Sequence, residues 1–285
     1  MNTEKNQQKW VKKCENILRM GGKSDRTIIN YKSAWNKLFK YYNDEFVLSK
    51  LKEEDLILYF KEEYLDKNMS GSTYNLALCA IRLLYEVCFK KSLNRILLPS
   101  TKLRKRYPTI ITKEEFLRIF NLEKNLTHKF WLILSFCSGL RAIDIAQLRI
   151  EYFYSNEHKL KVLGKGNKER YTILPDVVIR IGRIYCKANN IHDKTGYLFK
   201  SYRKEGFINP RSITNYFCNI KETFNIAKEI TEHSLRHSFA TYYLMNNGDL
   251  ITLKEMLGHK SLSTTCIYIH MAQDFNNLKG INYEN

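Results

Sequence analysis

The sequence lacks the features that define several large classes of protein. No window approaches eighteen consecutive apolar residues, so we predict no membrane-spanning helix. No apolar run follows the N-terminal residues, and we expect neither a signal peptide nor a transit peptide. A content of 44% apolar and 27% charged residues excludes a disordered chain. Together these features predict a folded cytoplasmic protein with no membrane partner.

Paired cysteines are also missing. The seven cysteines are odd in number, are scattered along the chain and never occur as C-x-x-C; they are Cys14, Cys79, Cys88, Cys137, Cys186, Cys218 and Cys266. A disulfide framework or a zinc site needs cysteines in characteristic pairs. The pattern therefore predicts free core thiols in a reducing compartment.

Nucleotide- and metal-binding motifs are incomplete or absent. Gly22-Lys23-Ser24 matches the end of a P-loop, but Ile17 stands where that motif requires glycine. Neither a G-x-G-x-x-G fingerprint nor a G-x-S-x-G elbow occurs. His233 and His237 are spaced like zinc ligands one helical turn apart, but no third ligand is evident. We therefore expect no metal and no cofactor.

Positive charge is what the sequence has in excess. The chain holds 47 Lys and Arg residues against 29 Asp and Glu residues, a net charge of +18. Residues 1–108 hold 22 against 12, a net +10, and residues 109–285 hold 25 against 17, a net +8. Such an excess favours phosphate-rich partners through counterion release, although a membrane surface would also attract it. If the partner is DNA, both halves are expected to contact it.

The apolar pattern of residues 1–93 predicts a small domain of four helices. Between Arg26 and Tyr42, apolar residues recur every three or four positions, which places them on one face of a helix. Similar stripes cover residues 11–18, 56–64 and 74–88. Residues 94–109 interrupt this periodicity with two prolines and a basic cluster. They are predicted to be a linker to a second domain at 110–285.

The second domain combines helices with one predicted β-hairpin. A helix is expected after Thr112, because Glu115 three residues later completes a capping box. Residues 159–163 and 169–174 alternate polar and apolar side chains around the turn Gly164-Lys165-Gly166-Asn167. The remaining segments have mostly helical periodicity. The predicted fold class is therefore mainly α (α+β), with a small antiparallel sheet.

Two polar patterns near the C-terminus are candidates for a functional site. On a helix, His233, Arg236 and His237 share one face that would suit an anionic ligand, although an ordinary solvated face has the same composition. A glycine is expected to end the next helix and to turn His259 away from its axis. Tyr268 falls in the second turn of a following short helix, but most of the 19 tyrosines must be structural.

The order of the motifs resembles that of the tyrosine recombinase (phage integrase, Xer-like) family. The segments that carry the resemblance are Gly139-Leu140-Arg141 with Asp144, Gly164 to Arg170, His233-Ser234-Leu235-Arg236-His237, Leu257-Gly258-His259, and Tyr268. It covers roughly residues 109–275, and the helical first half more weakly resembles the family's core-binding (SAM-like) domain. The resemblance implies a site-specific DNA recombinase that cleaves and rejoins DNA.

The resemblance also implies a role for each matching residue. Those in catalytic positions are Arg141, Lys165, His233, Arg236, His259 and Tyr268, with Asp144 in a supporting position. Tyr268 would attack the scissile phosphate, giving a 3′-phosphotyrosine and a free 5′-hydroxyl. Arg141 and Arg236 would hold the non-bridging oxygens, His259 would hydrogen-bond the phosphate, and Lys165 would protonate the leaving oxygen.

Two residues beside these positions have open roles. Lys168 lies near the same turn as Lys165 and is an alternative to it, although Lys165 directly follows the first glycine of the turn. His237 matches no catalytic position of the family, so we expect it to pack or to support its neighbours.

The same resemblance implies particular partners. We expect double-stranded DNA as the substrate, a homotetramer on paired sites, and no ATP or metal ion. The segment before Trp10 is short, which predicts that the arm-site domain of some phage integrases is absent. Residues 272–285, including Phe275 and Leu278, are predicted to be a segment that subunits exchange.

Two other functions compete with recombination. A type IB topoisomerase would use the same pocket without exchanging strands between duplexes. A non-catalytic DNA-binding regulator would use residues 240–257 as a helix-turn-helix, with Tyr268 in its core. The regulator leaves Arg141, the lysine hairpin and His259 without a role, so recombination explains more of the sequence.

Overall fold

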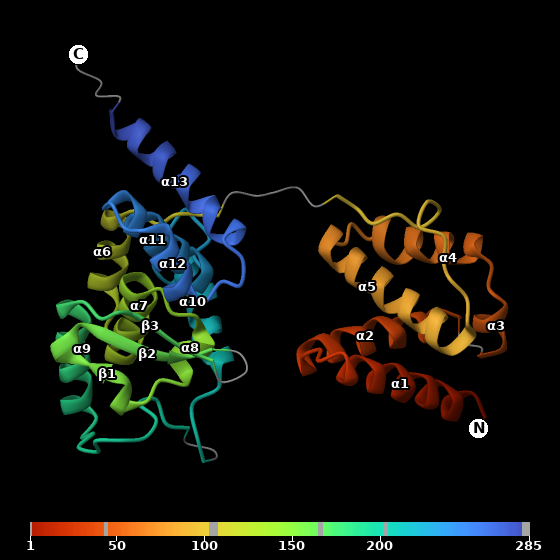
Figure 1. The fold of residues 1–285 in the computed structure, drawn as a ribbon, viewed down its shortest axis with the longest axis horizontal. Coiled ribbons are helices and arrows are strands. Elements are labelled where there is room, and N and C mark those ends of the chain that lie inside the picture. Colours follow the sequence, from red (N-terminus) through yellow and green to blue (C-terminus); the bar gives the residue numbers. More distant parts are fainter. Residues whose placement is uncertain (1, 43–44, 103–107, 165–167, 202–204, 281–285) are drawn as a thin grey trace. The chain divides into compact units, whose positions relative to one another are not determined.

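The computed structural model describes residues 2–42, 45–102, 108–164, 168–201 and 205–280. The chain divides into two compact units, residues 1–106 and 107–285. Each unit has its own cluster of buried apolar side chains. Figure 1 draws both units as ribbons coloured along the sequence. In the part of the chain that the structure describes, no helix is both long and apolar enough to cross a membrane.

The described part of the N-terminal unit is built from helices. They are α1 (Asn2–Met20), α2 (Asp25–Tyr42), α3 (Glu45–Lys50), α4 (Glu53–Phe60) and α5 (Gly71–Leu84). Short π-helical segments, Lys61–Leu65 and Tyr85–Phe89, continue α4 and α5. The four predicted apolar stripes correspond to α1, α2, α4 and α5, which confirms the predicted helical domain. The six-residue α3 is not predicted, because it is too short to show a periodic stripe.

Aromatic side chains hold this unit together. Trp35 of α2 is fully buried, and its indole Nε1 donates a 2.7 Å hydrogen bond to the carbonyl oxygen of Ala80 in α5. The buried Tyr85 hydroxyl donates to the Leu48 carbonyl oxygen at 3.0 Å. Both polar groups are thereby satisfied while their rings fill the core, as buried Trp and Tyr side chains require.

The first half of the predicted linker is attached to the N-terminal unit. Thr101 donates its backbone N–H to Asn75 Oδ1 at 2.9 Å, and Asn75 Nδ2 donates to the Thr101 carbonyl oxygen at 2.9 Å. Asn75 therefore fastens the chain to α5 just before the basic cluster. The cluster's residues 104–106 lie outside the described residues.

The described part of the C-terminal unit is mostly helical. Its helices are α6 (Lys113–Leu122), α7 (Leu126–Ser138), α8 (Ala142–Ala146), α9 (Asp176–Ala188), α10 (Pro210–Thr223), α11 (Glu232–Met245), α12 (Leu250–Leu257) and α13 (Ser263–Gly280). Helix α7 packs against α9, α11 and the sheet, while α11 and α13 pack together. Figure 1 shows α11, α12 and α13 gathered in one blue region of this unit.

The sheet of this unit is small and antiparallel. Its strands β1 (Phe153–Tyr154), β2 (Lys159–Leu163) and β3 (Glu169–Ile173) pair in the order β1-β2-β3. The hairpin of β2 and β3 confirms the predicted alternation, with Val162 opposite Arg170. Strand β1 is too short for its sequence pattern to show. The predicted α+β fold class, dominated by helix, is therefore confirmed.

Local capping groups set where the helices of this unit begin and end. Thr112 Oγ1 accepts from the Glu115 N–H at 3.1 Å, and the Glu115 carboxylate accepts from the Thr112 N–H at 2.8 Å, so the predicted capping box is present. Asp249 caps α12 through the Thr252 N–H at 2.7 Å. Gly258 ends α12 with φ of 64°, a left-handed conformation that glycine adopts without strain. The chain can therefore turn away at His259.

Candidate active site

The predicted site residues lie on separate segments of the C-terminal unit. Arg141 precedes α8, His233 and Arg236 are on α11, His259 follows α12, and Tyr268 is on α13. Helix α11 packs against α13, α7 and α12, which brings these segments together. Lys165, predicted at the hairpin turn, lies outside the described residues.

Arg236 is held by the ends of two helices. Its side chain is buried, and Nη1 donates to the Gly139 carbonyl oxygen at 2.5 Å, while Nη2 donates to the Leu257 carbonyl oxygen. Gly139 follows α7 and Leu257 ends α12. Burial, reinforced by the charge of Arg141, lowers the pKa of Arg236 to about 9. The guanidinium is fixed in position and remains a cation at neutral pH.

Arg141 stands next to this guanidinium at the start of α8. Its backbone N–H donates to Asp144 Oδ2 at 2.9 Å. Burial lowers the pKa of Arg141, whereas the carboxylate of Asp144 acts in the opposite direction. The fields of Arg141 and Arg236 both act on the Tyr268 hydroxyl. The positive charges of both arginines therefore act on the predicted nucleophile.

Asp144, predicted to support the site, forms a buried ion pair with Arg170 of β3. Arg170 Nη2 donates to Asp144 Oδ2 at 2.5 Å, and their side chains are 9% and 3% exposed. Arg170 Nε also donates to the Met256 carbonyl oxygen at 2.9 Å. The pair links α8, β3 and α12 around the two site arginines. The sequence places Arg170 in the hairpin motif but gives no sign of this role, which depends on contacts across more than 20 residues.

His259 lies beside Tyr268 and is anchored to α13. Its Nδ1 is 2.9 Å from the Oγ1 of the buried Thr265, and its ring is stacked against Tyr268 with centroids 6.4 Å apart. Burial and the charges of Arg236 and Arg141 lower the pKa of His259 to about 4. The ring is therefore neutral at pH 7 and offers one N–H donor.

Tyr268 is almost fully buried, with 2% of its surface exposed. Its hydroxyl lies 2.8 Å from Nδ1 of His237. Burial raises the pKa of this phenol, while the positive charges of Arg236 and Arg141 partly offset the shift. Sequence reasoning gave His237 only a packing or supporting role, but the structure places it in direct contact with the predicted nucleophile. The one sign of this contact in the sequence is that His237 lies one helical turn after the predicted site residue His233.

His233 occupies the outer edge of the site. Its side chain is 63% exposed, and Nε2 is 3.8 Å from the carboxylate of Glu232. Its ring centroid is 6.3 Å from that of His237. Glu232 itself accepts hydrogen bonds from the Ala142 N–H at 3.1 Å and from the Thr214 hydroxyl at 3.3 Å. The start of α11 is thus tied to α8 and α10, and His233 faces solvent.

The hairpin approaches the site through β3. Gly164 donates its N–H to the Lys168 carbonyl oxygen at 2.8 Å, which closes the turn between the strands. The side chain of Lys168 is exposed. Lys168 therefore remains an alternative to Lys165 as the predicted proton donor.

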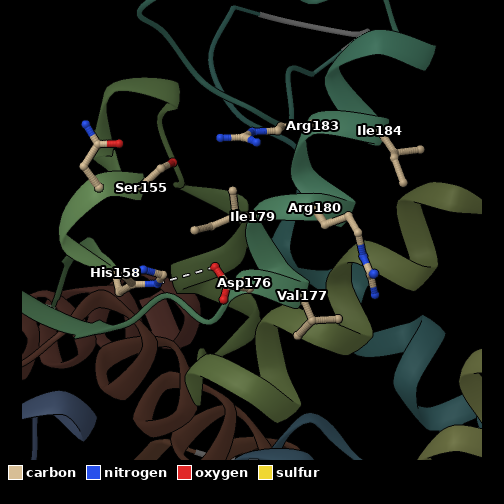
Figure 2. A pocket seen from close by; sticks show the side chains of 9 residues that line it. Ser155, His158, Asp176, Val177, Ile179, Arg180, Arg183 and Ile184 are labelled. Atoms are coloured by element: carbon tan, nitrogen blue, oxygen red, sulfur yellow. Dashed lines mark ion pairs between the residues drawn. The ribbon is translucent and has the colours of Figure 1, made fainter.

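A hollow on another part of the unit contains none of the predicted site residues. It lies between residues 155–158 and α9, and its lining includes Arg180 and Arg183. Figure 2 shows these side chains together with the ion pair of His158 and Asp176, whose atoms are 3.8 Å apart. The candidate site around Tyr268 is instead a packed cluster of side chains. Among the described residues, no group of three or more His, Cys, Asp or Glu side chains is arranged to hold a metal ion.

Family models match both units of the chain. The model described as "Phage integrase family" matches residues 109–274. The model described as "Phage integrase, N-terminal SAM-like domain" matches residues 10–95. The first match contains all the predicted site residues, and the second covers most of α1 and all of α2 to α5.

Curated relatives are named as tyrosine recombinases. A tyrosine recombinase of Thermosipho africanus is 31% identical over 60% of this chain and 60% of its own length. The tyrosine recombinase XerD of Staphylococcus haemolyticus is 34% identical over 62% of this chain and 63% of its own length. XerD of Halalkalibacterium halodurans is 28% identical over 88% of this chain and 89% of its own length. The chain thus matches about three fifths of the first two relatives.

Solved recombinase structures share the fold. The XerH site-specific recombinase bound to a palindromic difH substrate has a TM-score of 0.71 and 21% identity, covering 90% of this chain and 80% of that one. A lambda integrase (75–356) dimer bound to a COC′ core site has a TM-score of 0.70 and 17% identity, covering 92% of this chain and 94% of that one. At these identities the likeness concerns the fold.

Proposed function

The chain belongs to the phage integrase family, whose model matches more than half of its length, and from this premise we propose that it is a tyrosine-type site-specific DNA recombinase. It cleaves a DNA strand through a covalent 3′-phosphotyrosine on Tyr268 and rejoins it to a new partner. The observation that carries this proposal is the buried Tyr268 hydroxyl within the fields of Arg141 and Arg236. Three separate chain segments converge to make this arrangement.

The two arginines suit the charge that develops on the phosphate. As the tyrosine oxygen attacks, negative charge concentrates on the equatorial oxygens of the pentacoordinate phosphorus. Planar guanidinium groups donate paired hydrogen bonds that fit this geometry better than an ammonium does. Carbonyl oxygens hold Arg236 in advance, so little reorganisation is needed during the reaction. His259, neutral and beside Tyr268, would add a further donor to the phosphate.

Proton transfer to the leaving group completes cleavage. We assign this step to Lys165 at the tip of the β2–β3 hairpin, with Lys168 as the alternative. A lysine there would protonate the departing 5′-oxygen as a general acid. The phosphotyrosine conserves the energy of the phosphodiester, so rejoining needs no ATP. Because arginines supply the positive charge, we also propose that the reaction uses no metal ion.

Double-stranded DNA is the proposed substrate, and a homotetramer on paired sites is the proposed assembly. Net charges of +10 and +8 on the two halves favour phosphate contacts by both. The XerH and lambda integrase neighbours were both solved bound to DNA sites.

The exchanged segment was predicted at residues 272–285, and the structure describes few of its side chains. Deletion from Asn277 is expected to impair assembly on DNA, and unchanged assembly and recombination would contradict that role.

A nicked suicide substrate tests the proposed chemistry directly. After cleavage beside a nick, the short 5′-ended fragment diffuses away and the protein remains attached to the DNA. The wild-type protein is expected to form a covalent adduct that survives denaturing electrophoresis. The Tyr268→Phe variant keeps the ring but lacks the attacking oxygen, so it is expected to form none. Equal trapping by both proteins would show that Tyr268 is not the nucleophile.

Strand exchange between two duplexes separates the recombinase from a topoisomerase. Two differently labelled duplexes that carry the site are mixed with the protein, and products joining both labels are measured. A recombinase produces joined strands and junctions, whereas a type IB topoisomerase only relaxes supercoils. Relaxation without joined products would overturn the proposal of site-specific recombination while leaving the phosphotyrosine chemistry intact.

A further inference from the structure

Among the residues that the structure describes, His237 is the side chain hydrogen-bonded to the Tyr268 hydroxyl, the proposed attacking group. Its Nδ1 lies 2.8 Å from the Tyr268 hydroxyl, and the two ring centroids are 5.6 Å apart. Building on the proposed function, we infer that His237 is a catalytic residue that holds the Tyr268 hydroxyl and accepts its proton as the oxygen attacks phosphorus.

The proposed role requires one form of the imidazole. For the phenol O–H to donate, Nδ1 of His237 must carry a lone pair and Nε2 must carry the proton. Burial, together with the charges of His233 and Arg236, lowers the pKa of His237 to about 4. The ring is therefore neutral at pH 7, which is the state that can accept a proton.

The other two histidines of the site are occupied differently. Nδ1 of His259 is engaged with the hydroxyl of Thr265 at 2.9 Å, and its ring lies parallel to that of Tyr268. His233 has a side chain that is 63% exposed and sits beside the carboxylate of Glu232. Within the described chain, the imidazole nitrogen that meets the phenol oxygen therefore belongs to His237.

The proposed step balances without a further reactant. The O–H bond of Tyr268 breaks, its proton moves to Nδ1 of His237, and the oxygen forms a bond to phosphorus. The bond from phosphorus to the 5′-oxygen breaks, and that oxygen takes a proton from the general acid assigned to Lys165. During rejoining, the 5′-hydroxyl attacks phosphorus and returns its proton to the lysine, while His237 returns the first proton to the departing phenolate.

The groups around His237 make its ability to accept a proton depend on whether DNA is bound. The titratable and charged groups that face it are His233 and Arg236 from α11, Tyr268 from α13 and His259 after α12. The cationic neighbour makes an imidazolium unfavourable in the free protein. A phosphate bound to the arginines adds negative charge, which stabilises an imidazolium at His237. Protonation is thereby favoured when DNA occupies the site.

Replacement of His237 by asparagine separates proton transfer from positioning. Asparagine can place its amide oxygen near the position of Nδ1 and accept the phenol hydrogen bond, but it cannot take up a proton at neutral pH. We expect the single-turnover rate of covalent trapping to fall by roughly 10² or more in His237→Asn and in His237→Ala. His158→Asn, a histidine change in the hollow of Figure 2, is the matched control and should keep the wild-type rate.

A second experiment makes the phenol at position 268 more acidic. Site-specific replacement of Tyr268 by 3,5-difluorotyrosine lowers the pKa of the attacking phenol and reduces its need for a base. The fluorinated residue should restore most of the trapping rate in the His237→Asn background and have little effect with His237 present. DNA binding and thermal melting of each variant establish that it is folded.

Several results would overturn the role of His237 in proton transfer. Wild-type trapping by His237→Asn would show that the histidine only positions the phenol. A folded, DNA-binding His237→Asn variant that difluorotyrosine fails to rescue would also exclude it. These outcomes leave the proposed function standing, since that depends on covalent trapping by the wild-type protein and its loss in Tyr268→Phe.

Discussion

At the scale of single residues, the charged side chains of the site differ in their partners: some are paired with an opposite charge, and others are held by neutral groups. Asp144 and Arg170 pair with each other and are buried, whereas Arg236 is held by neutral carbonyl oxygens. A guanidinium held by carbonyl groups keeps its full positive charge for a phosphate. A carboxylate in the same position would cancel that charge. The Asp144 carboxylate is thus paired with Arg170, while the hydrogen-bond acceptors that the structure gives Arg236 are neutral.

Removing one member of this pair should destabilise the fold. In Arg170→Met, the carboxylate of Asp144, only 3% exposed, would lose its partner. We expect the free energy of unfolding to fall by about 3–5 kcal/mol, as measured by urea denaturation. Lys200→Met is the matched control, because its pair with Asp193 is about 60% exposed and should contribute less than about 1 kcal/mol. Equal losses in both variants would contradict a buried pair.

The two buried histidines should make stability depend on pH. Each folded-state pKa of about 4 lies below the ordinary value of 6.5, so the unfolded chain binds more protons between these values. Stability from His237 and His259 is thus present above pH 6.5 and is lost as the pH falls toward 4. Between pH 7 and pH 5 we expect a loss of roughly 1–3 kcal/mol from the pair, after allowance for partial solvent access.

Unfolding of a double variant isolates this effect from the titration of carboxylates. A protein with His237→Asn and His259→Asn should show a flatter decline in the free energy of unfolding between pH 7 and pH 5. The exposed His158→Asn variant should decline like the wild-type protein. An unchanged slope in the double variant would mean that the two histidines titrate alike in the folded and unfolded chains.

Among the helices, the C-terminal ends of α7 and α12 help to position the site. Gly139, after α7, and Leu257, at the end of α12, present their carbonyl oxygens to Arg236. Helix C-termini carry unsatisfied carbonyl groups and partial negative charge, which suits a cation. Gly258 then releases the chain toward His259. Two helix ends thus place one arginine and one histidine of the site.

Gly139, at the end of α7, is a position where an added side chain would clash. It adopts φ of +67°, and a Cβ atom there would lie 2.4 Å from Cδ1 of the Phe239 ring. Gly139→Ala is therefore expected to lower the free energy of unfolding by more than about 2 kcal/mol and to slow covalent trapping, since the carbonyl that holds Arg236 must move. Urea denaturation and the suicide substrate measure the two effects.

Gly22 provides the matched control for this substitution. Its φ of +65° is nearly the same, but a Cβ atom there would meet no atom within 4 Å. Gly22→Ala should therefore cost only the backbone strain, about 1 kcal/mol, and leave trapping unchanged. Equal losses in both variants would show that the contact with Phe239 does not matter.

At the scale of the whole molecule, both units are expected to act on one DNA. The domain division proposed from the sequence, 1–93 and 110–285 joined by a basic linker at 94–109, stays a prediction. Each unit of the structure has its own core, so each can present a basic surface independently. The net charge of +18 then predicts an affinity dominated by phosphate contacts.

The salt dependence of DNA binding tests this expectation. If both units contact phosphates, raising the salt concentration from 50 to 200 mM should reduce the affinity of the intact chain by roughly 10³-fold or more. Fluorescence anisotropy with a labelled duplex measures this slope. A loss smaller than about tenfold would indicate that few phosphates are neutralised and that one unit contributes little.

Local features of the chain were readable from the sequence. Apolar spacing within one helix predicts α2 and α5, a Thr-to-Glu spacing predicts the start of α6, and the glycine at 258 predicts the end of α12. Alternation over five residues predicts β2 and β3. Each of these signals lies within one element, because backbone hydrogen bonding and side-chain periodicity are local. Short elements such as α3 and β1 carry too few residues to show them.

The sequence by itself determined the family, the mainly helical fold and the set of candidate side chains. Tertiary structure alone decided which of them touch. The Tyr268 hydroxyl meets His237, 31 residues away in the sequence, because α11 and α13 pack together. Arg170 meets Asp144, 26 residues away, because β3 packs against α12 and the Arg170 side chain reaches α8. Such contacts depend on the packing of whole elements, which fixes distances that no local pattern encodes.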